Sequence, residues 1–182
     1  MRLSIVIPVY NMERFLEKCL DSAFNQSFSD YEIVAVNDGS TDSSRTILSQ
    51  YETANTKIRV IDQENRGLGG ARNTGIQHAA GEFLVFLDSD DYIPSNMLEE
   101  IDSYLQEYNL DILAFDCNMV NTSGKILQVA TVADIPDEYT TLSKKQFLLL
   151  EPTACLKVYR RSLYTAHAIL FPERMWYARP WW

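Results

Sequence analysis

Three carboxylates stand within four residues in the segment Asp88-Ser89-Asp90-Asp91. Carboxylates this close repel one another unless a cation or strong hydrogen-bond donors neutralise them. A divalent metal can do so, and Mg²⁺ is typically held by one or two carboxylates together with substrate phosphates. An acidic turn ahead of a helix beginning near Ser95 explains the same residues, so both interpretations stay open. The segment lacks the glycine and the distal glutamate of an EF-hand loop.

A second polar cluster, Asn37-Asp38-Gly39-Ser40, follows a short apolar run. Asp38 and Gly39 are typical of a turn, after which Ser40 or Thr41 caps the next helix. The carboxylate of Asp38 is also suited to accept hydrogen bonds from a nucleobase. The two roles are compatible.

The segment Asn65–Asn73 combines three glycines with Arg72. It does not match the dinucleotide-binding pattern G-x-G-x-x-G, because Arg72 occupies the place of the last glycine and the segment follows the third apolar run instead of the first. Its glycines favour close approach of the backbone to a ligand, with Arg72 on the first turn of a helix as a fixed cation for a base or a diphosphate. A surface loop with a solvated arginine is the alternative.

These clusters need a scaffold, and the hydrophobic pattern predicts one. Short apolar runs alternate with amphipathic segments, which indicates βαβ crossovers and an α/β fold of the Rossmann-like kind, with a mostly parallel sheet and helices on both faces. We expect Asn11 to cap the first helix. The expected strands are 3–9, 33–36, 58–61, 83–87 and 112–115, and the expected helices are 15–24, 43–53, 69–80 and 95–108.

All the polar clusters fall after predicted strands. In an open parallel sheet the carboxyl ends of the strands share one edge, where ligands bind. The cluster Pro8-Val9-Tyr10-Asn11 follows the first strand, so it joins the groups around Asp38 and Asp88 at that edge. Beyond residue 120 the alternation stops, and we expect a turn at 121–124, a loop at 133–141, short helices at 146–150 and 160–166, and a small irregular C-terminal subdomain.

The composition limits the class of protein. The 182 residues are 46% hydrophobic and 23% charged, which suits a globular domain and excludes disordered and collagen-like chains. A formal net charge of −9 argues against general nucleic-acid binding. Residues 1–120 carry 8 basic and 20 acidic side chains, a net of −12, whereas residues 121–182 carry 8 and 5, a net of +3. We therefore expect these two parts to face different partners.

The three cysteines, Cys19, Cys117 and Cys155, are widely spaced and form no C-x-x-C pair. This spacing predicts neither a disulfide framework nor a zinc site, and favours a reducing cytoplasm. Cys117 and Cys155 are interpreted as small core residues. The apolar run 3–9 is too short to span a membrane, so no transmembrane or secretory segment is expected.

The ordered set of motifs closely resembles the inverting nucleotide-sugar glycosyltransferases with the GT-A fold, often called family 2. The resemblance covers residue 3 to about residue 110, and extends more loosely through 157–161 and 171–173. It is carried by Ile5-Val6-Ile7-Pro8-Val9-Tyr10-Asn11, Val36-Asn37-Asp38-Gly39-Ser40-Thr41-Asp42, Asn65–Asn73 and Phe86-Leu87-Asp88-Ser89-Asp90-Asp91.

The resemblance implies a donor region at 1–120, an acceptor-side region at 121–182, and roles for particular residues. Asp38 would read a uracil-like edge, Arg72 would contact the base or the diphosphate, and Asp88 would lie near the ribose and the metal. Asp90 would be the direct ligand of Mn²⁺ or Mg²⁺. The metal would stabilise negative charge on the leaving oxygen of the donor diphosphate. The implied nucleotide-sugar-binding residues are Pro8, Val9, Tyr10, Asn11, Asp38, Arg72, Asp88 and Ser89, and the implied metal ligands are Asp88 and Asp90.

The sequence departs from the family where the general base is expected. Inversion requires a base that deprotonates the acceptor hydroxyl, and in similar proteins a Glu-Asp pair soon after the Phe-Pro-Glu segment supplies it. Here Ala178 and Arg179 stand at that place, and in the family pattern Glu173 is not the base. No catalytic residue is therefore assigned. The tryptophans at 176, 181 and 182 favour a truncated or altered C-terminus, with acceptor stacking as the alternative.

The leading hypothesis is a cytoplasmic, metal-dependent glycosyltransferase that moves a sugar from a UDP-sugar or similar donor to a saccharide or lipid-linked acceptor in surface polysaccharide synthesis. Leu148–Leu150 are interpreted as core residues, and the alternative is a lipid-facing patch beside Lys144 and Lys145 that would give a peripheral contact with the inner face of the membrane. A nucleotide-sugar-binding module without transfer activity is the second hypothesis. A nucleotidyltransferase or nicotinamide enzyme is disfavoured, because Val9-Tyr10-Asn11 contains no glycine.

Overall fold

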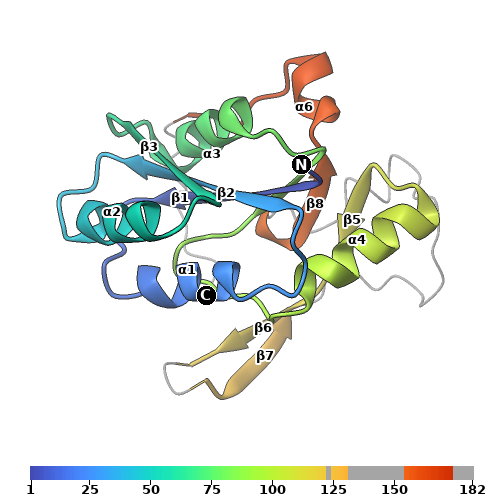
Figure 1. The fold of residues 1–182 in the computed structure, drawn as a ribbon, viewed down its shortest axis with the longest axis horizontal. Coiled ribbons are helices and arrows are strands. Elements are labelled where there is room, and N and C mark those ends of the chain that lie inside the picture. Colours follow the sequence, from blue (N-terminus) through green and yellow to red (C-terminus); the bar gives the residue numbers. More distant parts are fainter. Residues whose placement is uncertain (122–123, 131–153, 174–182) are drawn as a thin grey trace.

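A six-stranded mixed sheet organises the molecule (Figure 1). The computed structural model describes residues 1–121, 124–130 and 154–173. The strand order is β3-β2-β1-β4-β8-β5, and the first four strands run parallel, with β8 antiparallel to both of its neighbours. The strands are β1 Leu3–Val9, β2 Tyr31–Asp38, β3 Ile58–Gln63, β4 Phe83–Phe86, β5 Ile112–Ala114 and β8 Lys157–Arg160.

The central strands are buried along their whole length. Every residue of β1 and of β2 is buried, which requires cover on both faces of the sheet. Alternate side chains of β1 enter different cores: Ile5 packs with α1, α2 and α4, whereas Val6 packs with the end of α3 and with α6. Figure 1 shows these helices on opposite sides of the sheet. The helices are α1 Leu16–Phe24, α2 Ser44–Ala54, α3 Gly67–His78, α4 Met97–Tyr108 and α6 Ser162–His167, with a short 3₁₀ helix at Ala154–Leu156.

The predicted α/β class with a mostly parallel sheet is therefore confirmed, and β1 has the predicted bounds. The alternation of apolar and amphipathic segments did not predict one strand of this sheet. β8 comes from the C-terminal part of the chain and inserts between β4 and β5, pairing Val85 with Val158 and Leu113 with Val158. Four residues are too few to show a periodicity, so this strand becomes recognisable only by its partners. The division at residue 120 stays a prediction, although residues 157–160 lie inside the main sheet.

The start of α1 differs from the prediction. The helix begins at Leu16 with Phe15 at its N-cap position, so Asn11 does not cap it. Asn11 instead has a left-handed backbone with φ +55°, and its side chain bonds to the loop after β2. Residues 13–15, just ahead of the helix, form a turn that the hydrophobic pattern does not distinguish from helix.

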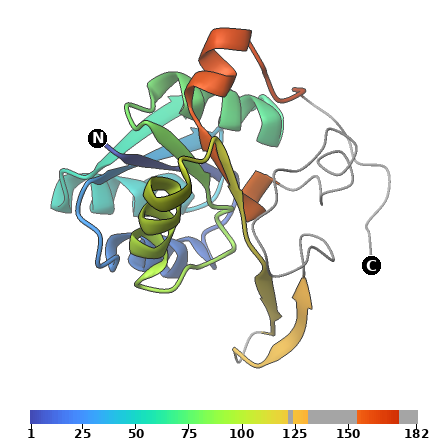
Figure 2. The same cartoon turned by 90° about the vertical axis from the view of Figure 1, so that its right-hand side faces the viewer.

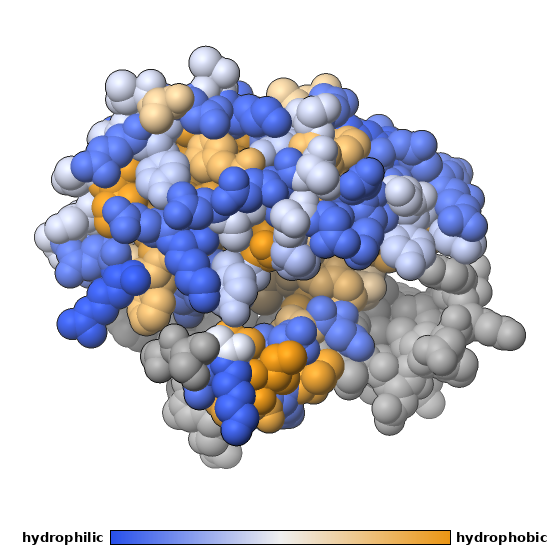
Figure 3. Space-filling model, turned by 60° about the horizontal axis from the view of Figure 1, so that its bottom comes forward, coloured by the Kyte–Doolittle hydropathy of each residue, from blue (hydrophilic) through white to orange (hydrophobic). Residues whose placement is uncertain are grey.

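A two-stranded hairpin, β6 Cys117–Val120 and β7 Ile126–Ala130, projects from the sheet (Figure 2). The predicted turn at 121–124 is confirmed by Asn121, whose N–H donates to Lys125 O and whose carbonyl accepts from Gly124 N–H. Figure 3 shows apolar side chains gathered on this hairpin. The exposed ones are Met119, Ile126, Leu127 and Val129.

The predicted short helix at 160–166 is observed as β8 followed by α6. The loop expected at 133–141, the helix at 146–150, the lipid-facing candidates at 144–150 and the tryptophans at 176, 181 and 182 lie outside the described residues. In the part of the chain that is described, none of the helices has the length and apolar character needed to cross a bilayer.

One close contact between α3 and the sheet gives a stability prediction. A Cβ built on Gly75 would lie 2.2 Å from Cγ1 of Val6, which is fully buried. We expect Gly75→Ala to lower the free energy of unfolding by about 1–2 kcal/mol in urea denaturation, since overpacking outweighs the better helix propensity of alanine. Gln77→Ala, at an exposed position of the same helix, is the control and should cause no loss. An unchanged or higher stability for Gly75→Ala would contradict the packing described here.

Candidate functional site

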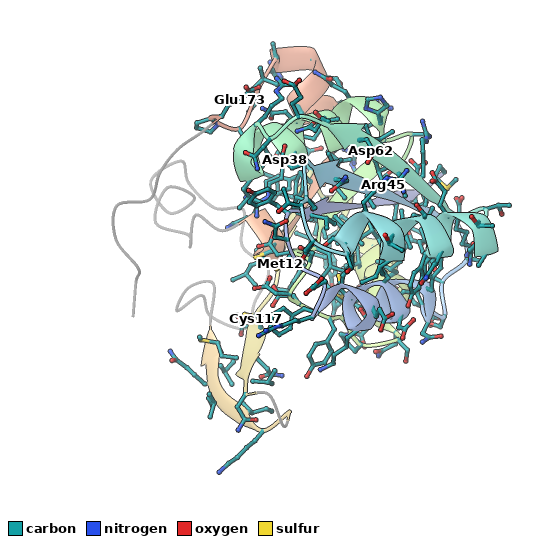
Figure 4. All side chains as sticks on the ribbon, turned by 90° about the vertical axis from the view of Figure 1, so that its left-hand side faces the viewer. Met12, Asp38, Arg45, Asp62, Cys117 and Glu173 are labelled. Carbon is teal, nitrogen blue, oxygen red and sulfur yellow. The ribbon has the colours of Figure 1, made fainter. Side chains whose placement is uncertain are left out.

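A cleft of about 740 Å³ lies where the loops after β1, β2 and β4 meet α3. It unites the predicted clusters: Tyr10 comes from the first loop, Asp38 from the end of β2, and Asp88 from the loop after β4. In the view of Figure 4, Asp38 lies between Met12 and Glu173 along one side of the molecule. The lining residues are Pro8, Val9, Tyr10, Met12, Asp38, Asn65, Gly67, Leu68, Ala71, Asp88, Ser89 and Asp90.

The first two loops are fastened to each other. Asn11 N–H donates to Ser40 Oγ at 3.1 Å, and Thr41 N–H donates to Asn11 Oδ1 at 2.8 Å. Further along, Met12 N–H donates to Ser44 Oγ at 2.9 Å. Asn11 is not among the residues that line the cleft, and its hydrogen bonds support the wall; its role in nucleotide-sugar binding stays a prediction. Each loop thus supplies hydrogen-bond partners for the other, and these bonds hold the wall of the cleft together.

The Asp38 carboxylate is buried at the end of β2, with 2% of the residue exposed. Its Oδ1 accepts hydrogen bonds from Gln63 Nε2 at 2.6 Å and from Arg66 N–H at 2.8 Å. Gln63 is held in turn by Thr74 Oγ1, which donates to its Oε1 at 2.6 Å. These donors come from β3 and α3, so three elements determine how Asp38 is presented to the cleft.

Arg72 pairs with Asp88, with 2.8 Å between Nη2 and Oδ1. The guanidinium also stacks over the ring of Phe171 at 5.5 Å, and its Nε is buried without a hydrogen-bond partner in the described structure. The protein thus supplies one of the cations that the acidic segment requires. Because α3 begins at Gly67, Arg72 lies in the second turn of the helix and not in the first as predicted.

Oxygen and sulfur ligand atoms converge beside this ion pair. Asp88, Asp91 and Cys155 each offer one atom that could bind a metal, and these three atoms all lie within 4.8 Å of one another. Desolvation, together with the charges of Asp90 and Asp88, raises the pKa of the Asp91 carboxyl to about 6. Desolvation also raises the pKa of the Cys155 thiol to about 12, with further contributions from Asp88 and Asp91, so this thiol is protonated at neutral pH.

The two carboxylates suit a hard divalent cation, whereas a protonated thiol is a poor ligand for Mn²⁺ or Mg²⁺. Ser89 is buried and Asp90 is exposed at the mouth of the cleft. The assignment of Asp90 as the direct metal ligand stays a prediction, and Asp91 joins the candidates. Sequence reasoning did not single out Asp91 within its acidic triplet, although the mutual repulsion of the three charges was the available signal.

The segment after α6 docks on the N-terminal half of α3. Asn73 Nδ2 donates to Phe171 O and Asn73 Oδ1 accepts from Phe171 N–H, both at 2.8 Å. Arg66 forms an ion pair with Glu173, and a Cβ on Gly69 would lie 2.0 Å from Pro172 O. The expectation that the glycines of this segment serve the approach of a ligand is therefore wrong for Gly69, which admits the protein's own backbone. Gly67, with φ +77°, does line the cleft.

Besides Asp91, sequence reasoning did not assign a site role to Cys155, Asn73, Gln63 or Thr74. Cys155 packs at the edge of a small core as predicted, and it also faces Asp88. It lies 67 positions from Asp88 in the chain, and no spacing rule connects the two. Ala178 and Arg179, which stand where an acidic pair is expected, lie outside the described residues.

The chain is an α/β protein with a cleft at the carboxyl ends of its parallel strands, which is where nucleotide-binding proteins of this class bind their ligands. The family profile described as "Glycosyl transferase family 2" matches residues 4–167. The chain belongs to this family.

Curated relatives carry the same assignment. The chain is 35% identical to glycosyltransferase GlyA of Streptococcus pneumoniae over 90% of its own length and 25% of that protein. It is 32% identical to the poly(ribitol-phosphate) beta-N-acetylglucosaminyltransferase TarS of Staphylococcus aureus, over 96% of this chain and 30% of TarS. The chain therefore spans a quarter to a third of the length of these relatives.

Solved structures confirm the GT-A fold. The structure of S. aureus TarS 1–349 in complex with UDP superimposes with a TM-score of 0.79 at 31% identity, covering 98% of this chain and 52% of that one. TarS 1–349 in complex with UDP-GlcNAc gives the same TM-score over 96% and 50%. The mannosyltransferase PcManGT from Pyrobaculum calidifontis, solved with GDP-Man and Mn²⁺, has a TM-score of 0.67 at 18% identity, a likeness of fold alone.

The role of Asn11 in the cleft wall can be tested by stability. Asn11→Ala removes the acceptor of Thr41 N–H and places alanine at φ +55°, so we expect a loss of about 1–3 kcal/mol in the free energy of unfolding. Asn11→Gly loses the same hydrogen bond but tolerates the backbone, and should cost less, about 1 kcal/mol. Chemical denaturation of both variants gives the comparison, and equal losses would show that the left-handed backbone contributes nothing.

Proposed function

We propose that this chain binds a UDP-sugar at the cleft and transfers the sugar, with inversion, to a saccharide or lipid-linked acceptor in cell-surface polysaccharide synthesis. One observation carries the proposal: in a family 2 chain, a single cleft is lined both by Asp38, which suits a nucleobase, and by Asp88, Ser89 and Asp90, which suit a ribose and a metal-bound diphosphate.

The choice of donor is supported by the chemistry of Asp38 and by the relatives. A buried carboxylate accepts hydrogen bonds and cannot donate them when ionised, so it suits a base edge that presents an N–H. Pro8, Val9 and Tyr10 give the cleft an apolar wall beside it, and flat apolar surface suits the faces of a base. TarS, which shares the fold at 31% identity, was solved with UDP and with UDP-GlcNAc.

The acidic segment is proposed to hold Mn²⁺ or Mg²⁺ together with the donor diphosphate. The side chains present suit such a cation, because carboxylate oxygens of Asp88 and Asp91 lie close together and Asp90 lines the cleft. When bound, such a metal stabilises the negative charge that develops on the leaving diphosphate. Arg72 holds Asp88 by its ion pair, which reduces the repulsion within the acidic segment and keeps one carboxylate oriented in the absence of the metal.

The remaining requirement is a base that removes the proton of the acceptor hydroxyl on the side opposite the leaving group. The sequence offers no acidic pair at 178–179. This is the specific observation that favours the second candidate function, a module that binds nucleotide sugars without transferring them. The two candidates share the donor site and differ only in turnover.

The setting is proposed to be the cytoplasm, with a peripheral contact to the inner face of the membrane. Cys19, Cys117 and Cys155 are all free thiols, which suits a reducing compartment. Nucleic acid is not a proposed partner, because a net charge of −9 opposes it.

The donor site is tested by calorimetric titration of UDP in the presence of Mn²⁺. We expect wild type to bind and Asp90→Ala to lose at least about tenfold in affinity, because the proposed metal would lose one of the residues that would hold it. Asp88→Ala and Asp91→Ala, measured alongside, rank the three carboxylates. Asp30→Ala removes the same charge at the exposed start of β2 and should leave the affinity unchanged. Absence of UDP binding by wild type would end the proposal.

Turnover separates the two candidate functions. With a UDP-sugar, Mn²⁺ and saccharide acceptors, a coupled assay of UDP release should show activity that falls at least about tenfold in Asp90→Ala. The double variant Ala178→Glu with Arg179→Asp supplies the acidic pair and should raise the rate if a base is what limits it. UDP binding without any UDP release, in wild type and in the double variant alike, would favour the binding module.

A further inference from the structure

The hydrogen bonds of Asp38 make its two carboxylate oxygens unequal. Gln63 Nε2 and Arg66 N–H both donate to Oδ1, at 2.6 Å and 2.8 Å. A carboxylate oxygen offers about two lone-pair positions, so these two donors fill Oδ1. Within the described structure, no hydrogen bond ends on Oδ2. Because Asp38 lines the cleft, it presents one available acceptor to a ligand there.

Thr74 determines which end of the Gln63 amide faces Asp38. Its hydroxyl donates to Gln63 Oε1 at 2.6 Å, which leaves the NH₂ end directed at the carboxylate. The reverse orientation would bring an amide oxygen against a carboxylate oxygen and would also break the bond to Thr74. Thr74 is buried, and Gln63 does not belong to the cleft lining, so Gln63 acts through Asp38 and not by contact with a ligand.

Nucleobases differ in the number of N–H groups that they present to a carboxylate. The pairing edge of uracil has a single N–H between two carbonyl groups. Guanine has two neighbouring donors, the ring N–H and the exocyclic amine, which match both oxygens of an unoccupied carboxylate. With Oδ1 filled, the second guanine donor would be buried beside Asp38 without a partner, and an unsatisfied buried donor is costly.

We infer that Gln63 is a specificity-determining positioning residue, oriented by Thr74, which limits Asp38 to one free acceptor oxygen and so makes the cleft select uracil over guanine. The inference rests on the proposed function, since it concerns the base of the same donor. Guanine is a meaningful competitor because the similarly folded PcManGT was solved with GDP-Man.

The test compares UDP with GDP, each titrated calorimetrically with Mn²⁺ into the 182-residue chain. We expect wild type to bind UDP about tenfold or more tightly than GDP. In Gln63→Met, which keeps the length of the side chain but has no donor, Oδ1 regains a lone pair. The affinity ratio of UDP to GDP should then fall at least about threefold. Damage to the fold alone would weaken both nucleotides and leave this ratio in place.

Thr74 supplies an independent variant and its matched control. Thr74→Val removes one of the two hydrogen bonds that orient the Gln63 amide, so the UDP to GDP ratio should fall, by less than in Gln63→Met because Asp38 still favours the NH₂ end. Thr74→Ser keeps the hydroxyl and should retain the wild-type ratio. If Gln63→Met binds neither nucleotide, the Thr74 pair decides, because Gln63 itself is then unaltered.

The outcomes are distinguishable from failure of the proposed function. If wild type binds neither UDP nor GDP, the donor site itself is wrong. If wild type binds both with similar affinity, or if the ratio is the same in wild type, Gln63→Met and Thr74→Val, the donor site stands and the role of Gln63 is overturned.

Discussion

Negative charge is crowded at one edge of the sheet, and the packing around the cleft has to compensate for it. Parallel strands deliver Asp38 and the acidic segment at 88–91 to the same cleft, and like charges in a partly desolvated place oppose folding. The protein meets this with donors that it carries itself. Arg72 pairs with Asp88, and Gln63 with the Arg66 amide satisfies one oxygen of Asp38. The raised pKa of Asp91 indicates that part of the negative charge in the acidic segment is not compensated by the protein. A bound cation can neutralise this remaining charge.

Helix α3 is the element that connects these solutions. Its first half accepts the backbone of Phe171 and Pro172, its side chains Arg72 and Thr74 reach the acidic segment and Gln63, and Gly75 brings it against β1. A helix so closely packed has little freedom to move relative to the sheet. This close packing would suit the proposed donor site, which has to orient a flexible nucleotide sugar.

The loops of the cleft are joined by polar contacts. Asn11, Ser40 and Thr41 exchange hydrogen bonds between the loops that follow β1 and β2, and Asp42 with Glu13 continue the pattern. Such a wall can expose Tyr10 to a ligand, because the backbone behind it does not depend on burying that ring. The TM-score of 0.79 to TarS shows that the two proteins share the fold, and this chain spans about half of the TarS structure.

The class of fold, the strand after which each polar cluster stands and the family were predictable from the amino-acid sequence, because apolar runs and the order of motifs are local properties of the chain. Most of the cleft lining was also predictable, since parallel strands bring their carboxyl ends to one edge. Four features became visible only in the folded chain: Asn11 supports a wall instead of capping a helix, β8 enters the main sheet, Gly69 contacts Pro172, and Cys155 and Asp91 meet Asp88. Each of these is a contact between residues distant in sequence or a choice among adjacent carboxylates, and no local pattern records which partner a side chain will find.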